Sequence, residues 1–164
     1  MQRRDFLNLA MAAGAAMALA GCGFRLRGFD TPGLALEELA LAGDDSELAR
    51  LVEERLTAIG TRVNDNAPLV LNLGPETFRV RQLSVLDSGP QEQEMSLTVP
   101  FSVQQRSDGA YRLSEQRLEV STRFTVSDDN LLAQDDLREE ARQDLRQEAQ
   151  RRLFDRLRAV TDGS

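Results

Sequence analysis

The sequence predicts an α+β fold in which two helices pack on one face of a four-stranded, mainly antiparallel sheet, in the order βαβββα. The first observation behind this prediction is that apolar residues recur at helical spacing in two segments and at every second position between them. The second is that each helical segment has one apolar stripe and the expected sheet has one apolar face. A two-layer sandwich buries all of these surfaces together and leaves the other sheet face polar and open.

The first strand and the first helix are expected before residue 61. Apolar residues predict a short strand that ends at Gly43, and the Asp44-Asp45-Ser46 run consists of residues that cap helix N-termini. Helical spacing then continues until Gly60, a typical C-terminal stop. The strand residues are Leu36, Leu39 and Leu41, and the helical stripe is Leu48, Leu51, Val52, Leu56 and Ile59.

The second expected strand is irregular. Leucines recur at every second position before the Gly74-Pro75 break, with Val70 and Asn72 between them, apolar residues continue this spacing after it, and their parity changes after Arg81. A change of parity moves side chains to the opposite face, so a bulge is expected near Arg81 and Gln82. The alternating residues are Leu69, Leu71, Leu73, Phe78 and Val80, followed on the other parity by Leu83 and Val85.

The third and fourth strands are expected to form a hairpin. Apolar residues alternate from Met95 to Val103 and again from Leu118 to Val126, and the intervening Asp108-Gly109 is typical of a hairpin turn. Pro100 has no N–H to donate to a neighbouring strand. We therefore expect the third strand to be exposed on one edge or bulged at this residue.

The last segment predicts a long helix that begins after Asp128-Asp129. Its apolar residues recur every fourth position and form one continuous stripe. Arg138, Arg142 and Arg146 form a neighbouring positive column, which we expect to be a solvated face paired with nearby acids such as Glu139. The stripe consists of Leu137, Ala141, Leu145, Ala149, Leu153 and Leu157, widened by Leu132, Phe154 and Val160.

Residues 1–21 have the features of a bacterial signal peptide. The Arg3-Arg4 pair provides positive charge, an Ala-rich apolar stretch follows, and small residues precede Cys22. The apolar stretch is shorter than the about 20 residues that a helix needs to span a bilayer. We therefore expect cleavage before Cys22, a lipidated tether at residues 22–35 and a single α+β domain at residues 36–164. The arginine pair is compatible with a twin-arginine signal and with a Sec signal, and this alternative stays open.

The composition argues against an enzyme. The chain has no His, which is the commonest general base and metal ligand, and its single Cys is assigned to the lipid. It has no Gly-rich phosphate loop, no G-x-S-x-G motif and no spaced ligand cluster. We expect no catalytic residue, no metal and no cofactor. The net charge of −7 gives no general attraction to nucleic acid.

The residues around Cys22 resemble those of a known family. Leu19-Ala20-Gly21-Cys22 is similar to the lipobox of bacterial lipoproteins, whose cysteine carries diacylglycerol and an N-acyl chain. The longer run Gly21-Cys22-Gly23-Phe24-Arg25-Leu26-Arg27-Gly28 resembles the start of the mature LptE lipoproteins, and the chain length and element order agree with that family. The resemblance implies an outer-membrane, lipid-anchored protein on the periplasmic side. Such a protein plugs the LptD β-barrel, assists its assembly and contacts lipopolysaccharide in transit to the cell surface.

Contact with lipopolysaccharide phosphates would use arginine, which can hold a phosphate with two hydrogen bonds. The candidates are Arg79, Arg81, Arg106 and Arg123; the simpler interpretation of each is a solvent-facing strand arginine. The resemblance also implies basic contacts in the loop after the second strand and near the start of the last helix. This chain departs from the family there, because residues 84–89 and 133–136 contain no basic residue.

Two other functions are compatible with the sequence. A free-standing periplasmic lipid or lipopolysaccharide carrier would need an apolar groove between the helices and the sheet. An enzyme would need a pair of carboxylates in a cleft, whereas the carboxylates here are expected on solvated helix columns and turns. A filled core with a polar outer sheet face favours the plug over both.

Overall fold

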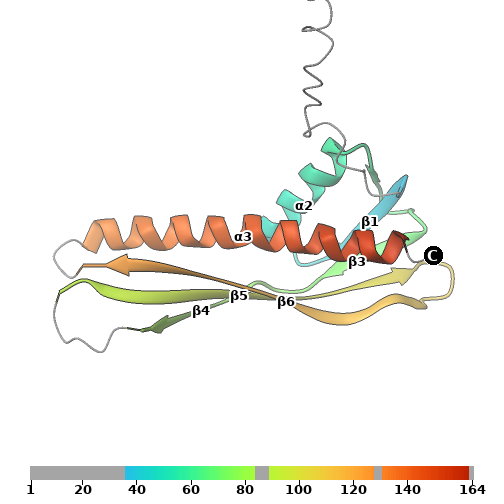
Figure 1. Ribbon diagram of the computed structural model, residues 1–164. Helices are drawn as coiled ribbons and strands as arrows, with labels where there is room; N and C mark the ends of the chain where they lie inside the picture. Colours follow the sequence, from blue (N-terminus) through green and yellow to red (C-terminus); the bar gives the residue numbers. More distant parts are fainter. Residues whose placement is uncertain (1–35, 84–88, 128–130, 163–164) are drawn as a thin grey trace, which may run out of the picture. The chain divides into compact units, whose positions relative to one another are not determined.

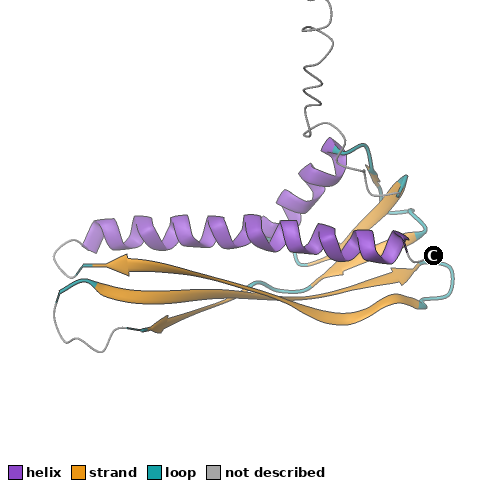
Figure 2. Ribbon diagram, viewed as in Figure 1, coloured by secondary structure: helices purple, strands orange, loops and turns teal. Residues whose placement is uncertain are grey.

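A six-stranded mixed sheet is built around one central strand, β5 (Figure 2). The computed structural model describes residues 36–83, 89–127 and 131–162, all within the compact unit Gly33–Ser164. β6 pairs antiparallel with one edge of β5, and β3 and β4 share its other edge, also antiparallel. β1 joins β3 in parallel, and β2 joins β1 in parallel. The strands are β1 (Glu38–Gly43), β2 (Arg62–Val63), β3 (Leu69–Leu73), β4 (Thr77–Gln82), β5 (Gln91–Gln105) and β6 (Tyr111–Val126).

Both helices, α2 (Glu47–Ala58) and α3 (Leu131–Asp162), lie on the same face of this sheet (Figure 1). The apolar stripe of α3 packs on the inward side chains of β5 and β6, as the alternation and the helical spacing predict. The two-layer α+β architecture is therefore confirmed. Residues with at most 1% exposure at the centre of this core are Leu39, Leu48, Val52, Leu71, Leu97, Leu145, Ala149 and Leu153.

The prediction of four strands is wrong, because two features of the sheet have no pattern of their own in the sequence. β2 has only two residues, too few to show a period, and it exists because it pairs in parallel with β1. The expected second strand is divided into β3 and β4, which meet different halves of β5.

The irregularity of this strand lies at Gly74-Pro75 and not at Arg81-Gln82. The β4–β5 register continues without a shift as far as the pair Gln82 and Gln93, so the expected bulge is absent from the described part of β4. Val85, on which that expectation depended, lies outside the described residues. The chain breaks its ladder where Pro75 cannot donate a hydrogen bond.

Pro100 lies within the central strand, so the expectation that this strand has a free edge is wrong. The Pro100 carbonyl accepts a hydrogen bond from Gly74 N–H at 2.8 Å, which turns the proline toward the interruption between β3 and β4. The N–H that Pro100 lacks would point to the same side, where the ladder is interrupted. The expected bulge is found nearby, as register shifts between Phe101, Val103 and Gln104 in the pairing with β6.

The capping residues of α2 behave as expected. Ser46 is the N-cap, and its Oγ accepts a hydrogen bond from Ala49 N–H at 3.1 Å. Gly60 follows the helix with φ +90°, a conformation that glycine adopts without strain. In the described part of the chain, no helix combines the length and the hydrophobicity needed to cross a bilayer.

Candidate functional site

The face of the sheet opposite the helices is polar. Side chains alternate along a strand, so the residues between the buried ones of β4, β5 and β6 share this side. In register, Arg79 lies beside Ser96, and Ser96 lies beside Ser121. We call this surface the outer sheet face; its residues are Thr77, Arg79 and Arg81 on β4, Glu92, Glu94, Ser96 and Thr98 on β5, and Arg117, Glu119, Ser121, Arg123 and Thr125 on β6.

Two adjoining hollows lie along the outer sheet face. One has a volume of about 470 Å³ and the other about 420 Å³, and Arg79 and Glu119 line both. The walls of the larger hollow are mostly hydroxyl, carboxylate and guanidinium groups, whereas Pro75 and Pro100 add apolar surface to the smaller one. The first is also lined by Arg81, Glu94, Ser96, Val120, Ser121 and Arg152, and the second by Pro75, Thr77, Thr98, Pro100 and Arg117.

Two of the predicted arginines share one carboxylate. Arg81 Nη2 lies 2.9 Å from Glu94 Oε1, and Arg123 Nε lies 3.8 Å from the other oxygen of the same group. Arg123 also lies 3.9 Å from Glu92. Both guanidinium groups are well exposed, so these ion pairs are weak and can open toward a ligand.

Arg79 and Arg117 differ from these two because neither makes an ion pair or side-chain hydrogen bond within the described residues. Both side chains are exposed, and both line the smaller hollow together with Thr77 and Thr98. Each guanidinium therefore offers all of its donors to an outside group. Glu119 is the acid that also lines this hollow.

Arg106 does not belong to this group. Its Nε donates to Ala67 O at 2.9 Å and its backbone N–H donates to Pro68 O at 2.8 Å. The residue thus holds the segment before β3 in place. Of the four predicted arginines, Arg79, Arg81 and Arg123 lie on the outer sheet face and Arg106 does not.

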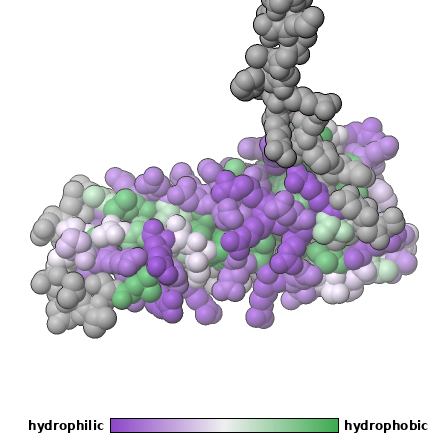
Figure 3. Space-filling view, in the orientation of Figure 1, coloured by the Kyte–Doolittle hydropathy of each residue, from purple (hydrophilic) through white to green (hydrophobic). Residues whose placement is uncertain are grey.

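The free edge of β6 is covered by an arginine from α3. Arg152 Nη1 donates to Glu119 O at 2.9 Å, and its Nε lies 3.1 Å from Glu148 Oε1. Hydrogen bonds from Arg151 and Arg152 hold the pKa of Glu148 below the usual value of a glutamate. In Figure 3, the visible face is mainly hydrophilic around its middle and carries apolar patches toward both ends.

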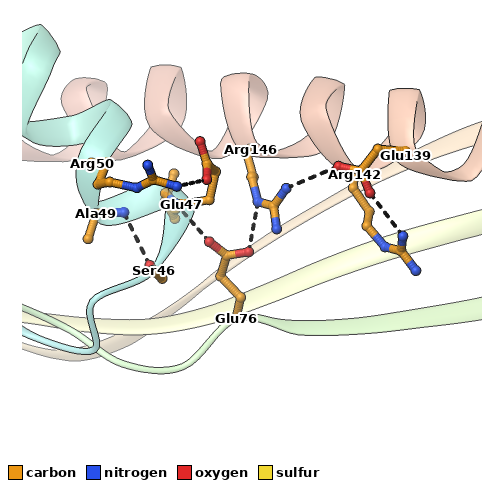
Figure 4. Close-up of polar contacts among 9 residues, drawn as sticks. Ser46, Glu47, Ala49, Arg50, Glu76, Glu139, Arg142 and Arg146 are labelled. Atoms are coloured by element: carbon orange, nitrogen blue, oxygen red, sulfur yellow. Dashed lines mark hydrogen bonds and ion pairs between the residues drawn. The ribbon is translucent and has the colours of Figure 1, made fainter.

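A buried ion pair fixes β4 against both helices. Glu76, just before β4, accepts a hydrogen bond from Leu48 N–H at 2.8 Å and pairs with Arg146 Nε at 2.9 Å. The two side chains are only 9% and 16% exposed. Arg146 also lies over the Phe78 ring, 5.2 Å from its centroid. Figure 4 shows this contact between the α2 N-terminus, α3 and the start of β4.

The positive column of α3 is therefore only partly the solvated face that the sequence predicts. Arg138 pairs with Asp135 at 3.2 Å and Arg142 with Glu139 at 3.0 Å, both at i,i+3 spacing on the surface. Arg146 is largely buried, because its main partner comes from the sheet rather than from its own helix.

Arg117 lies on the outer sheet face and Arg152 lines its larger hollow from α3, although neither is predicted from the sequence. Arg117 could have been found, since it has the same parity as Arg123 on one unbroken strand. Arg152 could not, because its contact with β6 depends on how α3 packs. The described residues contain no group of His, Cys, Asp or Glu able to hold a metal ion. Residues 1–35, which include Cys22 and the expected signal peptide and tether, and residues 84–88 lie outside the described residues.

Comparisons with known proteins agree with this architecture. Rare lipoprotein B from Shewanella oneidensis has a similar solved structure, with a TM-score of 0.65, 24% identity, and coverage of 75% of this chain and 95% of that one. A minor lipoprotein from Acinetobacter baumannii has a TM-score of 0.63, 19% identity, and coverage of 75% and 91%. These similarities show a shared fold. No curated protein matches the chain at a significant level.

The family model for LptE, described as lipopolysaccharide-assembly, matches residues 26–157. This match covers most of the chain, including every strand and nearly all of α3. The chain therefore belongs to the LptE family of lipopolysaccharide-assembly lipoproteins.

Proposed function

We propose that this protein is an outer-membrane lipoprotein that plugs an LptD-type β-barrel, helps that barrel to assemble and takes part in moving lipopolysaccharide to the cell surface. Its family membership supports the assembly role. The observation that carries the proposal is the outer sheet face, an ordered polar surface that spans three strands. Lumens of transmembrane barrels are polar, so a plug needs such a surface.

The rigidity of this surface comes from the core behind it. β5 and β6 pair from Gln91 and Val126 as far as Gln104 and Tyr111, and α3 covers their inner side along much of that length. Backbone pairing and a packed core hold the outer side chains at fixed spacings. A plug of this kind can offer a fixed surface on which the strands of a barrel pack, because it does not lose conformational entropy by folding during docking.

The N-terminal segment would attach the domain to the membrane. We propose that residues 1–21 direct export, that Cys22 carries the diacylglycerol and the N-acyl chain, and that residues 22–35 tether the domain of residues 36–164 to the outer membrane. A tether of that length spans at most roughly 50 Å when fully extended. The domain would therefore stay close to the membrane that holds the barrel.

Lipopolysaccharide contact is assigned to the arginines of the outer sheet face. Arg79 and Arg117 are the first choice, because both line one hollow and neither has a partner among the described residues. Arg81 and Arg123 are secondary contacts that would first release Glu94. Arg106 is a weaker candidate contact, since it lies apart from the outer sheet face and its Nε already donates to Ala67 O.

The rival function, a free-standing lipid carrier, would need an apolar groove between the two layers. The residues between α3 and the sheet are instead packed, with Leu97 and Leu153 at 0% exposure. The larger hollow of the outer sheet face is mainly polar, and arginine, threonine and glutamate line the smaller one beside its two prolines. These observations favour the plug.

Affinity purification of the tagged full-length protein from detergent-solubilised outer membranes tests the proposal. We expect an LptD-type barrel to be recovered in stoichiometric amount. A Cys22→Ala variant should lose membrane attachment, which checks the anchor separately. A clean preparation without the barrel, from membranes that contain it, would contradict the plug role and favour the lipid carrier.

A further inference from the structure

β4 has a second edge on which no described strand pairs. Leu83 N–H donates to Glu92 O at 2.8 Å, so the backbone of Leu83 faces β5. Backbone groups alternate between the two edges of a strand, so Arg81, Arg79 and Thr77 also face β5. The N–H and C=O groups of Phe78, Val80 and Gln82 then face outward. We call this row, with the Val80 side chain, the β4 edge.

The β4 edge carries apolar surface on its helix side. Phe78 pairs with Leu97 and Val80 with Met95, so both side chains lie on the face that holds the core. Phe78 is half-buried beneath Arg146. Val80 is 50% exposed, although Met95 beside it is fully buried. The helix layer thus covers Phe78 but ends before it covers Val80.

Arginine side chains flank the β4 edge on both sides; Arg81 is paired with Glu94 and Arg142 with Glu139. Arg79 and Arg81 extend from β4 on the outer sheet face, and Arg79 has no partner among the described residues. On the helix side, Arg142 lies one turn before Arg146, which is about 6 Å along the axis. Figure 4 shows Arg142 extending from α3 toward the strands.

The direction of α3 brings Arg142 level with Val80. α3 runs opposite to β6, since Gln134 contacts Ser127 and Arg152 contacts Glu119. It therefore also runs opposite to β4. One turn back along α3 from Arg146 leads to Arg142. Two residues forward along β4 from Phe78 leads to Val80, about 6.6 Å away in a strand. The two steps have nearly the same length, so Arg142 lies level with Val80.

We propose that the β4 edge accepts an extended segment of a partner protein as an added strand, with side chains that alternate between apolar and acidic. The backbone groups of Phe78, Val80 and Gln82 would pair with that segment. Its apolar side chains would cover Val80, and its acidic side chains would meet Arg79 and Arg81. This pairing does not depend on the proposed barrel or on lipopolysaccharide.

Charge disfavours a second copy of this chain as the occupant. Two β4 edges paired with each other would bring Arg79 and Arg81 of both copies onto one face, where like charges repel. The edge of β6 differs from the β4 edge, because Arg152 already occupies the Glu119 carbonyl there. Such covering is how natural sheets protect an edge, and the described residues provide none at Val80.

The test uses the purified full-length lipoprotein in detergent and a fluorescein-labelled, strand-length peptide of alternating valine and glutamate. Fluorescence anisotropy should show saturable binding. Val80→Pro replaces the isopropyl group with an apolar ring and removes an outward N–H, so no hydrogen bond of the β4–β5 ladder is lost. We expect it to weaken binding about tenfold or more. Val80→Thr is the matched control, since it keeps that N–H and the branched shape, and should change affinity less than about threefold.

Two further peptides keep the result independent of how the variants fold. A peptide with every amide N-methylated cannot donate to the edge, and one with lysine in place of glutamate reverses the charge. Neither should bind the unmodified lipoprotein. Equal binding of the glutamate and lysine peptides, wild-type affinity in Val80→Pro, or no binding of the glutamate peptide would each overturn the proposal.

Discussion

Removing one partner of the ion pair between Glu76 and Arg146 should destabilise the protein more than removing one partner of a surface ion pair. Arg146→Met keeps the aliphatic length but leaves the Glu76 carboxylate, 9% exposed, with the Leu48 amide as its remaining partner. Breaking a buried pair in this way costs about 3 kcal/mol. Glu76→Gln keeps an acceptor for Leu48 and should cost about 2 kcal/mol.

The double variant gives the sharper result. Once Arg146 is replaced by methionine, the additional change Glu76→Gln removes an unpaired buried charge, so the two effects should not add. We expect a coupling free energy of about 2 kcal/mol from urea unfolding curves followed by circular dichroism. Arg142→Met, whose pair with Glu139 is 41% and 51% exposed, is the control and should cost about 0.5 kcal/mol. Additivity of the Glu76 and Arg146 effects within about 0.5 kcal/mol would refute this reasoning.

Three other predictions follow from the packing and the ion pairs. Gly74→Ala would place its Cβ 2.5 Å from Pro100 Cγ, so it should lower stability by about 2 kcal/mol in thermal unfolding, and adding Pro100→Ala should restore most of the loss. Leu153→Ala, at a position with 0% exposure, should cost about 3 kcal/mol in urea unfolding. Because the pKa of Glu148 is lowered, its contribution to stability is present above the pKa of an unfolded glutamate and is lost as pH falls through the lowered value. Replacing Arg151 and Arg152 with alanine should raise that pKa in an NMR titration, and an unchanged midpoint would contradict the assignment.

The elements with strong local signals could be predicted from the sequence. α2 has Ser46 at its start and Gly60 after its end, and α3 has an unbroken apolar stripe, so local chemistry determines both. The β5–β6 hairpin is equally clear, because its alternation is regular and Asp108-Gly109 marks the turn. The outer sheet face follows from the same alternation.

The features that depend on pairing could not be predicted. β2 is recognisable only from its contact with β1, and the effect of Pro100 depends on where β3 ends. Arg106 and Arg146 look like surface arginines in the sequence, yet one holds Ala67 and the other Glu76. Each of these roles is set by a partner distant in the chain, which residue type and spacing do not reveal.

The claim that the outer sheet face binds lipopolysaccharide phosphates through Arg79 and Arg117 is tested most directly by comparing two double variants. One replaces Arg79 and Arg117 with glutamine, and the other replaces Arg55 and Arg112, which are exposed and also without partners among the described residues. Both remove the same charge, so a general electrostatic effect would be equal.

Binding to immobilised lipopolysaccharide is measured beside the same lipid stripped of its phosphates. We expect the Arg79 and Arg117 variant to bind about tenfold more weakly, and the Arg55 and Arg112 variant to stay within about threefold of wild type. The difference in affinity between the two variants should disappear on the lipid without phosphates. Equal weakening by both variants, or no weakening by the first, would contradict the claim.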